Sequence, residues 1–395
     1  MSVAILLILS LLGSTWAFVL YPIRLRQRAR RASRRVWPRD YEPAVTVIIP
    51  VFNRASMIEE KLRNTLTLDY PANRMEVLVV SDGSTDGTDA IVEAEQDPRV
   101  RLLALPRGGK LIAIQQGGHR ARGEVLVFTD ADTLLDPRSL RALLRPLADP
   151  FVGAVCGARK LRRSRRGDGT VVGEAFFARV ERRIRRLESR LGSVHAGDSA
   201  LYAVRRSLFV PAVNPAQADD IAISARVILS GKRFVYAADA VCRKPAVGDA
   251  VQDFRRRVQV ANYGIRALLD LRSERRLPPA YVMQIFSHTI ARLLIPVFLA
   301  AGITTSAILT PVHAIFAGVL GAHLLLLTLA LAGWVLRHAR AGRRPILSIP
   351  CCFVMHSLAG FVGVLGVAYG LRPLGATPRR AHGVASIPAR GIVAR

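Results

Sequence analysis

Short apolar runs alternate with helical patterns between residue 44 and about residue 240. The apolar runs are rich in β-branched residues, which is typical of buried strands. Strands are expected at Val45–Ile49, Glu76–Val80, Val100–Ala104 and Val125–Phe128, with helices at Met57–Leu68, Asp89–Glu95 and Lys110–Ala121. This alternation predicts an α/β domain with a mixed, mainly parallel sheet flanked by helices, whose ligands bind at the carboxyl ends of the strands.

Both ends of the chain are strongly apolar. The run Val3–Leu20 is just long enough to span a bilayer, and the arginines that follow it favour a retained anchor with the next domain in the cytoplasm. Further apolar runs cover Leu293–Leu309, Val312–Leu336 and Ile346–Leu371. If each run crosses once, the tail after Leu371 lies outside, although its arginines favour the inside.

These patterns divide the chain into segments. Phe254–Leu271 is arginine-rich and amphipathic, which suits a helix lying at a membrane surface. The predicted division is an anchor at 1–22, a basic linker at 23–43, the α/β domain at 44–250, an interfacial segment at 251–280, about three membrane helices at 281–372 and a basic tail at 373–395.

Composition adds a strong positive charge. The 395 residues carry a formal net charge of +28, and only five of the 57 basic residues are lysines. Such a field favours anionic partners, including nucleotide diphosphates and acidic lipid headgroups. The four cysteines lack metal-ligand spacing and are expected to be reduced and buried.

Asp130 and Asp132 follow the apolar run that ends at Phe128. Carboxylates at positions i and i+2 can hold one hard divalent cation, Mg²⁺ or Mn²⁺, which also binds phosphate oxygens. An isolated pair with this spacing is more often an Asx turn. Its place at the end of a strand in an α/β domain favours the metal site.

Asp82 also follows a strand, and it is a candidate to accept hydrogen bonds from a base or a ribose. The next residue, Gly83, allows close backbone approach. Lys110 ends a basic turn that starts at Arg107, and its ammonium group can meet phosphate. A solvated basic turn explains the same segment equally well.

Asp219 and Asp220 open the helical pattern that runs to Leu229. Adjacent carboxylates at a helix start are commonly caps. If an acceptor hydroxyl must lose its proton, Asp220 is the candidate general base and Asp219 the neighbour that tunes it.

Three residues outside these carboxylate motifs are further candidates. Gly197 begins a small-residue segment that suits the floor of an acceptor site, although core packing explains it as well. Arg256 and Arg257 can stabilise a departing diphosphate or contact anionic lipids.

Taken in order, these segments resemble the family 2 glycosyltransferases, whose fold is called GT-A. The likeness covers roughly residues 45–265 and includes Ile49-Pro50-Val51-Phe52-Asn53, Asp82-Gly83-Ser84, Gly109-Lys110, Thr129-Asp130-Ala131-Asp132, Gly197 through Arg206, and Ala218-Asp219-Asp220.

The resemblance implies a role for each motif. The donor is expected to be a UDP-sugar, with Pro50, Phe52, Asn53 and Asp82 on the substrate side. By the same resemblance Asp130 and Asp132 serve the metal and Asp220 is the base. Two departures matter. The Q-x-x-R-W motif of processive synthases is absent, because Arg256-Arg257-Val258-Gln259-Val260 contains no tryptophan, and Asp219 stands where the family often has glutamate.

The expected protein is therefore a multi-pass cell-membrane enzyme with a cytoplasmic catalytic domain. It is expected to invert configuration, to act non-processively, and to transfer sugar to a lipid-linked or cell-envelope glycan acceptor, with anionic lipids as further partners. No nucleic-acid motif is visible, and no nucleic-acid partner is expected. The alternatives are transfer onto polyprenyl phosphate, or a non-catalytic basic membrane protein that binds anionic lipid or nucleic acid.

Overall fold

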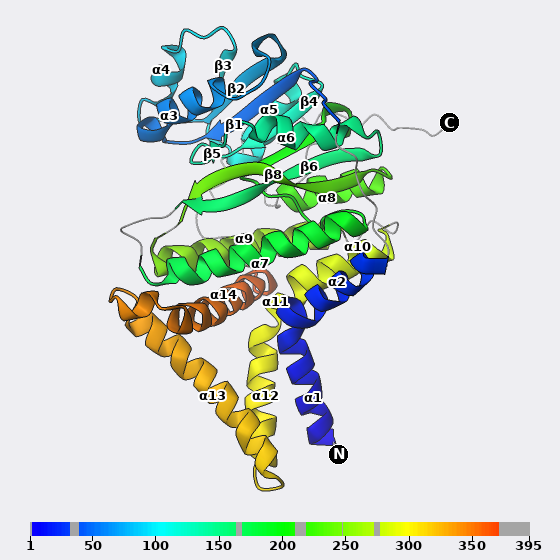
Figure 1. Ribbon diagram of the computed structural model, residues 1–395. Helices are drawn as coiled ribbons and strands as arrows, with labels where there is room; N and C mark the ends of the chain where they lie inside the picture. Colours follow the sequence, from blue (N-terminus) through cyan, green and yellow to red (C-terminus); the bar gives the residue numbers. More distant parts are fainter. Residues whose placement is uncertain are drawn as a thin grey trace.

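The computed structural model describes residues 2–31, 39–162, 168–209, 219–246, 248–271 and 277–370, without the side chains of Asp219, Asp220 and Asp270 (Figure 1). Its described residues form an eight-stranded sheet of order β3-β2-β1-β4-β7-β6-β8-β5. The strands are β1 Val45–Val51, β2 Met75–Asp82, β3 Val100–Leu105, β4 Val125–Thr129, β5 Leu134–Leu135, β6 Val152–Arg162, β7 Leu201–Arg205 and β8 Arg233–Pro245.

The sheet has a parallel half and a mixed half. Strands β3, β2, β1 and β4 pair in parallel, whereas β7 runs antiparallel to both β4 and β6. Strand β6 is parallel to β8, and β8 is antiparallel to β5. The predicted strands are confirmed with ends shifted by at most two residues, and the four strands after Thr129 were not predicted.

Helices cover both faces of the sheet. They are α3 Ala55–Leu66, α4 Thr88–Glu93, α5 Lys110–Arg120, α6 Ser139–Leu144, α7 Thr170–Leu191, α8 Asp219–Leu229 and α9 Ala250–Leu271, with short 3₁₀ turns at Ala72–Arg74, Arg145–Ala148 and Arg206–Leu208. Because side chains alternate along a strand, Val47 and Ile49 enter one core with Leu62, while Ile48 enters the other with Ile114. The two-sided burial explains why the parallel strands are apolar throughout.

The apolar ends form helices that project from the domain (Figure 1). At the N-terminus, α1 Ser2–Thr15, a π-helical segment η1 Trp16–Leu20 and α2 Tyr21–Arg31 run on from one another. At the other end are α10 Pro279–Ile285, a second π-helical segment η5 Phe286–Ile290, α11 Ala291–Leu293, α12 Ile295–Leu309, α13 Ala314–Val335, a 3₁₀ turn Ala341–Arg343 and α14 Pro345–Ala368.

Three of these helical stretches in the described chain are long and apolar enough to cross a membrane: Ser2–Arg31, Ala314–Val335 and Pro345–Ala368. A fourth candidate is Pro279–Leu293 followed by Ile295–Leu309, a pair bent by 59°. The bend coincides with a proline in the first turn of α12, where the missing N–H breaks the hydrogen-bond ladder.

Helix α14 differs from α12 and α13 because it packs along the α/β domain, whereas they project away from it (Figure 1). The hydroxyl of Ser348 donates to the carbonyl of Gly169 at 2.5 Å and accepts from the amide of Gly173 at 2.8 Å. The Cys352 thiol donates to the carbonyl of Thr170 at 3.2 Å. These contacts hold the start of α14 against the start of α7, so close packing there requires small residues.

Replacing Gly173 by alanine should lower the thermal unfolding temperature of the detergent-purified protein. A Cβ at Gly173 would lie 2.5 Å from the Cys352 sulfur and 2.5 Å from the Ser348 carbonyl oxygen. Overpacking of this kind costs about 1–3 kcal/mol, which exceeds the helix-propensity gain of up to about 1 kcal/mol.

Gly318→Ala is the matched control, because a Cβ at Gly318 has nothing within 4 Å. Its unfolding temperature should equal or slightly exceed that of the wild type. Equal unfolding temperatures for the two variants would mean that α14 does not sit on α7.

Candidate active site

The predicted site residues gather at one edge of the parallel half of the sheet. Strands β1, β2 and β4 are parallel neighbours, so their carboxyl ends meet there. Phe52 and Asn53 follow β1, Asp82 ends β2, and Asp130 and Asp132 follow β4. The sheet topology therefore brings together motifs that lie up to 80 residues apart in the sequence.

Asp130 is held by two lysines. Its Oδ1 lies 2.5 Å from the Lys110 Nζ, and its Oδ2 lies 2.7 Å from the Lys244 Nζ. Burial alone would raise the pKa of Asp130, but the two ammonium groups outweigh it and hold the pKa well below its usual value. Asp130 is therefore ionised at neutral pH in spite of its burial.

Asp132 shares one of those lysines. The Lys244 Nζ lies 3.2 Å from the Asp132 Oδ1, and the Asp132 side chain is 30% exposed. A single positive centre thus already bridges Asp130 and Asp132, which shows that one cation can contact both carboxylates. The donor set consists of hard oxygens beside an open face, and it fits Mg²⁺ or Mn²⁺.

Asp82 fixes the basic turn that carries Lys110. Its carboxylate accepts hydrogen bonds from the amides of Gly108 at 2.7 Å and Gly109 at 2.9 Å, and it pairs with the Arg107 guanidinium. That guanidinium also lies over the Phe52 ring, 3.5 Å from its centroid. In this structure Asp82 binds its own chain, so its contact with a nucleotide stays a prediction.

Asn53 closes the same edge and has positive φ, at 49°. Its side-chain oxygen accepts from the Thr85 amide at 2.9 Å, and its own amide donates to the Ser84 hydroxyl at 3.2 Å. The left-handed conformation of Asn53 and these two long-range hydrogen bonds keep the segments after β1 and β2 together. Pro50 lies in β1 itself, opposite Val80 of β2.

Gly197 lies beside α8. Its amide donates to the Ser224 hydroxyl at 3.1 Å. The neighbouring Asp198 pairs with Arg159 at 3.3 Å and with Arg185 at 3.4 Å. The arginines lower the pKa of Asp198 in spite of its burial.

Two of the predicted groups are not placed at this edge. The backbone of Asp219 and Asp220 begins α8, but their side chains lie outside the described residues, so the predicted base is untested. Arg256 and Arg257 lie on α9, where the Arg257 Nε donates to Asp253 at 2.7 Å. Asp253 is also 3.1 Å from His356 of α14, so this pair joins two helices.

Comparison with known proteins identifies the domain. Residues 46–209 match the family described as glycosyl transferase family 2. The domain is a family 2 glycosyltransferase. The chain is 26% identical to a solved structure, the mannosyltransferase PcManGT from Pyrobaculum calidifontis in complex with GDP-Man and Mn²⁺. That likeness has a TM-score of 0.66 and covers 91% of this chain and 98% of the other, and it confirms the GT-A fold.

Two curated relatives share the glycosyltransferase domain. Poly-beta-1,6-N-acetyl-D-glucosamine synthase of Staphylococcus aureus (strain COL) is 25% identical over 212 residues, which is 51% of this chain and 50% of the synthase. Glycosyltransferase AglD of Haloferax volcanii is 36% identical over 124 residues, 29% of this chain and 19% of that protein. The chain thus spans about half, or less, of the length of these relatives.

The glycosyltransferase domain also contains a buried lysine that the sequence did not single out. Lys61 of α3 has no exposed surface. Its Nζ donates to the Thr129 hydroxyl at 3.0 Å and to the Thr133 carbonyl at 2.6 Å, on either side of the Asp130–Asp132 segment. Lys61 therefore fixes the shape of that segment from beneath. Burial lowers the pKa of Lys61 to about 7, with nearby carboxylates opposing the shift.

The free energy of unfolding should depend on pH through Lys61. Its pKa is about 7 in the folded protein and 10.5 ordinarily, so between these values the unfolded chain binds the extra proton. The free energy of unfolding therefore increases as pH rises through this range and decreases as pH falls. The change that Lys61 causes is at most about 1.4 kcal/mol per pH unit.

Thermal unfolding between roughly pH 7 and pH 9 checks this dependence. The wild type should gain stability relative to Lys61→Met as pH rises. Lys160→Met, which removes an exposed lysine, should track the wild type at every pH. A constant difference between the wild type and Lys61→Met would show that Lys61 does not titrate in this range.

Proposed function

We propose that this chain is a membrane-bound, inverting glycosyltransferase that moves a sugar from a nucleotide-sugar donor onto a lipid-linked or cell-envelope glycan acceptor. The observation that most supports this proposal is the pair Asp130 and Asp132 at the carboxyl edge of a family 2 glycosyltransferase domain. Lysine side chains form ion pairs with both carboxylates. Apolar helices in the same chain favour an acceptor at the membrane. The missing tryptophan after Arg257 favours transfer of one or a few sugars.

The donor's diphosphate would lie over Asp130 and Asp132. A divalent cation held by these carboxylates would neutralise the charge that develops on the leaving diphosphate. Lys110 and Lys244 reach the same position, and when such a cation takes the carboxylates their ammonium groups can turn to phosphate oxygens. The family resemblance of the sequence motifs favours a UDP-sugar, while the similar mannosyltransferase was solved with GDP-Man.

The acceptor hydroxyl would lose its proton to Asp220. A base at the start of α8 would belong to an element that contacts the predicted acceptor segment, because the Gly197 amide donates to Ser224 of α8. An inverting displacement needs such a base at a neutral hydroxyl. An acceptor that is already anionic, such as polyprenyl phosphate, needs little help from Asp220.

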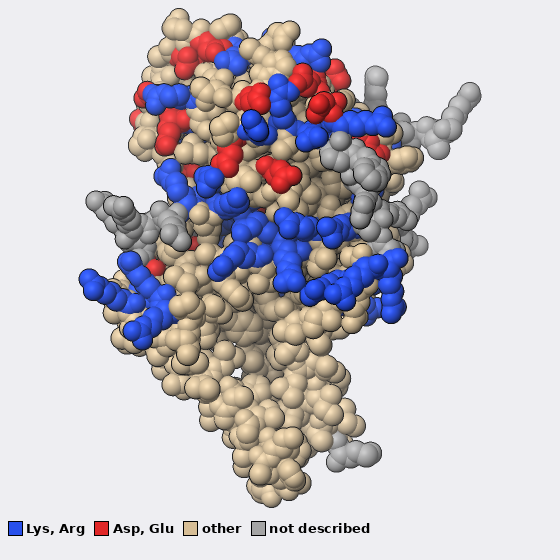
Figure 2. All heavy atoms as spheres, in the orientation of Figure 1, with Lys and Arg blue, Asp and Glu red and all other residues tan. Residues whose placement is uncertain are grey.

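Charge supports a membrane arrangement. In Figure 2 lysines and arginines form a belt across the middle of the molecule, and the lower helices on that face show neither sign of charge. Helix α2 carries five arginines, and the loop between α13 and α14 carries four. Basic segments favour the cytoplasm, so we infer that the belt and the catalytic domain lie on the cytoplasmic side.

We infer further that α14 lies along the membrane surface and does not cross it. Its later half packs on α9, where the Asn262 amide donates to the Gly363 carbonyl at 3.4 Å and His356 meets Asp253. A crossing α14 would carry Asp253 and Arg257 into hydrocarbon, at about 2.5–3.5 kcal/mol for each charged residue on insertion scales. In this arrangement the end of α14 stays on the catalytic side, where the arginines of the following tail are favoured.

Release of nucleoside diphosphate tests the transferase. Protein purified with native membrane lipids should release diphosphate from one donor in a panel that includes UDP-sugars and GDP-mannose, and only with Mg²⁺ or Mn²⁺. Asp132→Asn and Asp220→Asn should each lower the rate by about 10²–10⁴-fold.

Asp69→Asn is the control, because Asp69 is an exposed partner of Arg141 outside the site, and it should keep wild-type activity. A loss with Asp132→Asn but not with Asp220→Asn would favour polyprenyl phosphate as acceptor. No turnover of any donor, with lipid binding intact, would leave the non-catalytic alternative.

Reporter fusions test the position of α14. A green fluorescent protein joined after the C-terminus should fluoresce, and alkaline phosphatase at the same place should stay inactive, because both reporters would remain in the cytoplasm. Phosphatase inserted in the turn between α12 and α13 should be active. Active phosphatase at the C-terminus would show that α14 crosses.

A further inference from the structure

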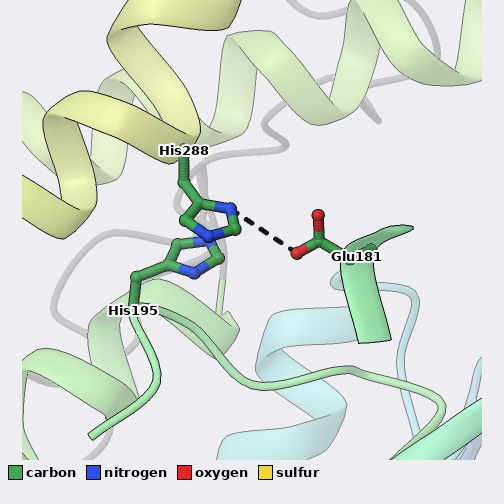
Figure 3. A group of neighbouring side chains, drawn as sticks. All are labelled: Glu181, His195 and His288. Atoms are coloured by element: carbon green, nitrogen blue, oxygen red, sulfur yellow. Dashed lines mark ion pairs between the residues drawn. The ribbon is translucent and has the colours of Figure 1, made fainter. Parts of the chain in front are cut away.

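A buried or partly buried group of ionisable side chains lies where the catalytic domain meets the membrane helices, away from the nucleotide edge (Figure 3). Glu181 and Glu188 are two turns apart on α7 and so share one face of that helix. His195 follows α7, and His288 comes from the π-helical segment η5. Such segments are rare in proteins and often mark functional sites.

The distances place three of these groups around one point. Ligand atoms of Glu181, His195 and His288 all lie within 4.8 Å of one another. The His288 Nδ1 is 3.6 Å from the Glu181 Oε1, its Nε2 is 3.1 Å from Glu188, and the His195 Nδ1 is 3.5 Å from Glu188. The two imidazole rings stack with centroids 3.7 Å apart.

The imidazoles lack the hydrogen bonds that their burial demands. The His288 side chain is 1% exposed, and within the described part of the chain neither of its ring nitrogens makes a hydrogen bond of acceptable geometry. The same holds for the His195 Nδ1. Buried polar groups are nearly always satisfied, so three such nitrogens facing two carboxylates point to a missing ligand.

We propose that Glu181, His195 and His288 bind a divalent transition-metal ion, with Glu188 as the charged neighbour of the two imidazoles. Two imidazole nitrogens and carboxylate oxygens are ligands that Zn²⁺ accepts, with bonds of about 2.0–2.2 Å. The observed separation of 3.6 Å between the His288 Nδ1 and the Glu181 Oε1 is close to what two such bonds span in a tetrahedron. The nitrogen ligands separate this site from the all-oxygen pair at Asp130 and Asp132.

The surrounding groups orient the carboxylates. The Tyr21 hydroxyl donates to the Glu188 Oε1 at 2.5 Å, and Arg292 donates to the Glu181 Oε2 at 3.0 Å, which leaves the Oε1 toward His288. Arg185 also contacts the Glu181 Oε1, at 3.3 Å, and shares its charge with Asp198. Hydrogen-bond donors of this kind hold the carboxylates of a metal site in a fixed orientation.

One of the proposed ligands also faces open space. Glu181 lines a small hollow together with Arg182 and Tyr236, and its side chain is 21% exposed.

The ion would join three parts of the fold. Glu181 and Glu188 belong to the catalytic domain, His288 belongs to the bent membrane segment, and Tyr21 connects the N-terminal helix. An ion that ties these elements together stabilises their packing in the folded protein. Its loss should therefore loosen the catalytic domain from the membrane helices and leave the nucleotide edge itself unchanged.

Metal content of the full-length protein tests the site. Protein without a histidine tag, purified in detergent and loaded with Zn²⁺ or Co²⁺, should retain about one ion per chain after desalting. The Co²⁺ form should show the intense visible absorption of a tetrahedral nitrogen–oxygen site. His288→Asn should abolish both signals, whereas Asp132→Asn and the exposed-histidine control His119→Asn should keep them.

A second variant tests the site in case His288→Asn does not fold. Tyr21→Phe keeps every ligand but removes the donor to Glu188, and it should weaken Zn²⁺ binding about 10–100-fold. Chelation should lower the unfolding temperature of the wild type and leave that of His288→Asn unchanged. Wild-type protein that retains no more Zn²⁺ or Co²⁺ than His288→Asn would overturn the proposal.

Discussion

Charged groups cannot be carried into hydrocarbon without a large cost, and this constraint organises the whole molecule. Helices α2, α7 and α9 are rich in arginine, and each lies where the globular part meets the apolar helices (Figures 1 and 2). Their arginines fix the level at which an apolar layer can begin. The catalytic sheet then stands above that level, and α1, α12 and α13 extend below it.

The cost of burying a charge also determines how charged groups are paired inside the domain. Asp130 is buried, and it stays ionised because two lysines from separate elements reach it. Lys61 lies below the same segment as a buried amine that positions its backbone. The acidic edge is therefore a balanced cluster in which a cation can replace an ammonium group without leaving a carboxylate unpaired.

Much of this architecture could be predicted from local pattern. The apolar runs that became β1 to β4 are continuous because both of their faces are covered, and Asp82, Asp130 and Asp132 mark their ends. Local pattern could not predict the contacts of Lys244 with Asp130 and of Lys61 with Thr129, because these contacts depend on the packing of strands and helices that are distant in the sequence. Nothing in the composition of η1 or η5 distinguishes a π-helix from an α-helix. The side chain of Asp220, on which the predicted base rests, lies outside the described residues.

The two π-helical segments are joined directly, because the Trp16 indole nitrogen donates to the Ser287 hydroxyl at 3.0 Å. A π turn holds one more residue than an α turn between bonded groups. Loss of a single residue in η1 can therefore be absorbed by a return to α geometry, whereas the same loss in η5 would displace His288 and in α13 would rotate everything beyond it. Natural variation in chain length should for that reason be tolerated in η1, and the N-terminal helix could be lengthened or shortened there during evolution without disturbing the catalytic sheet.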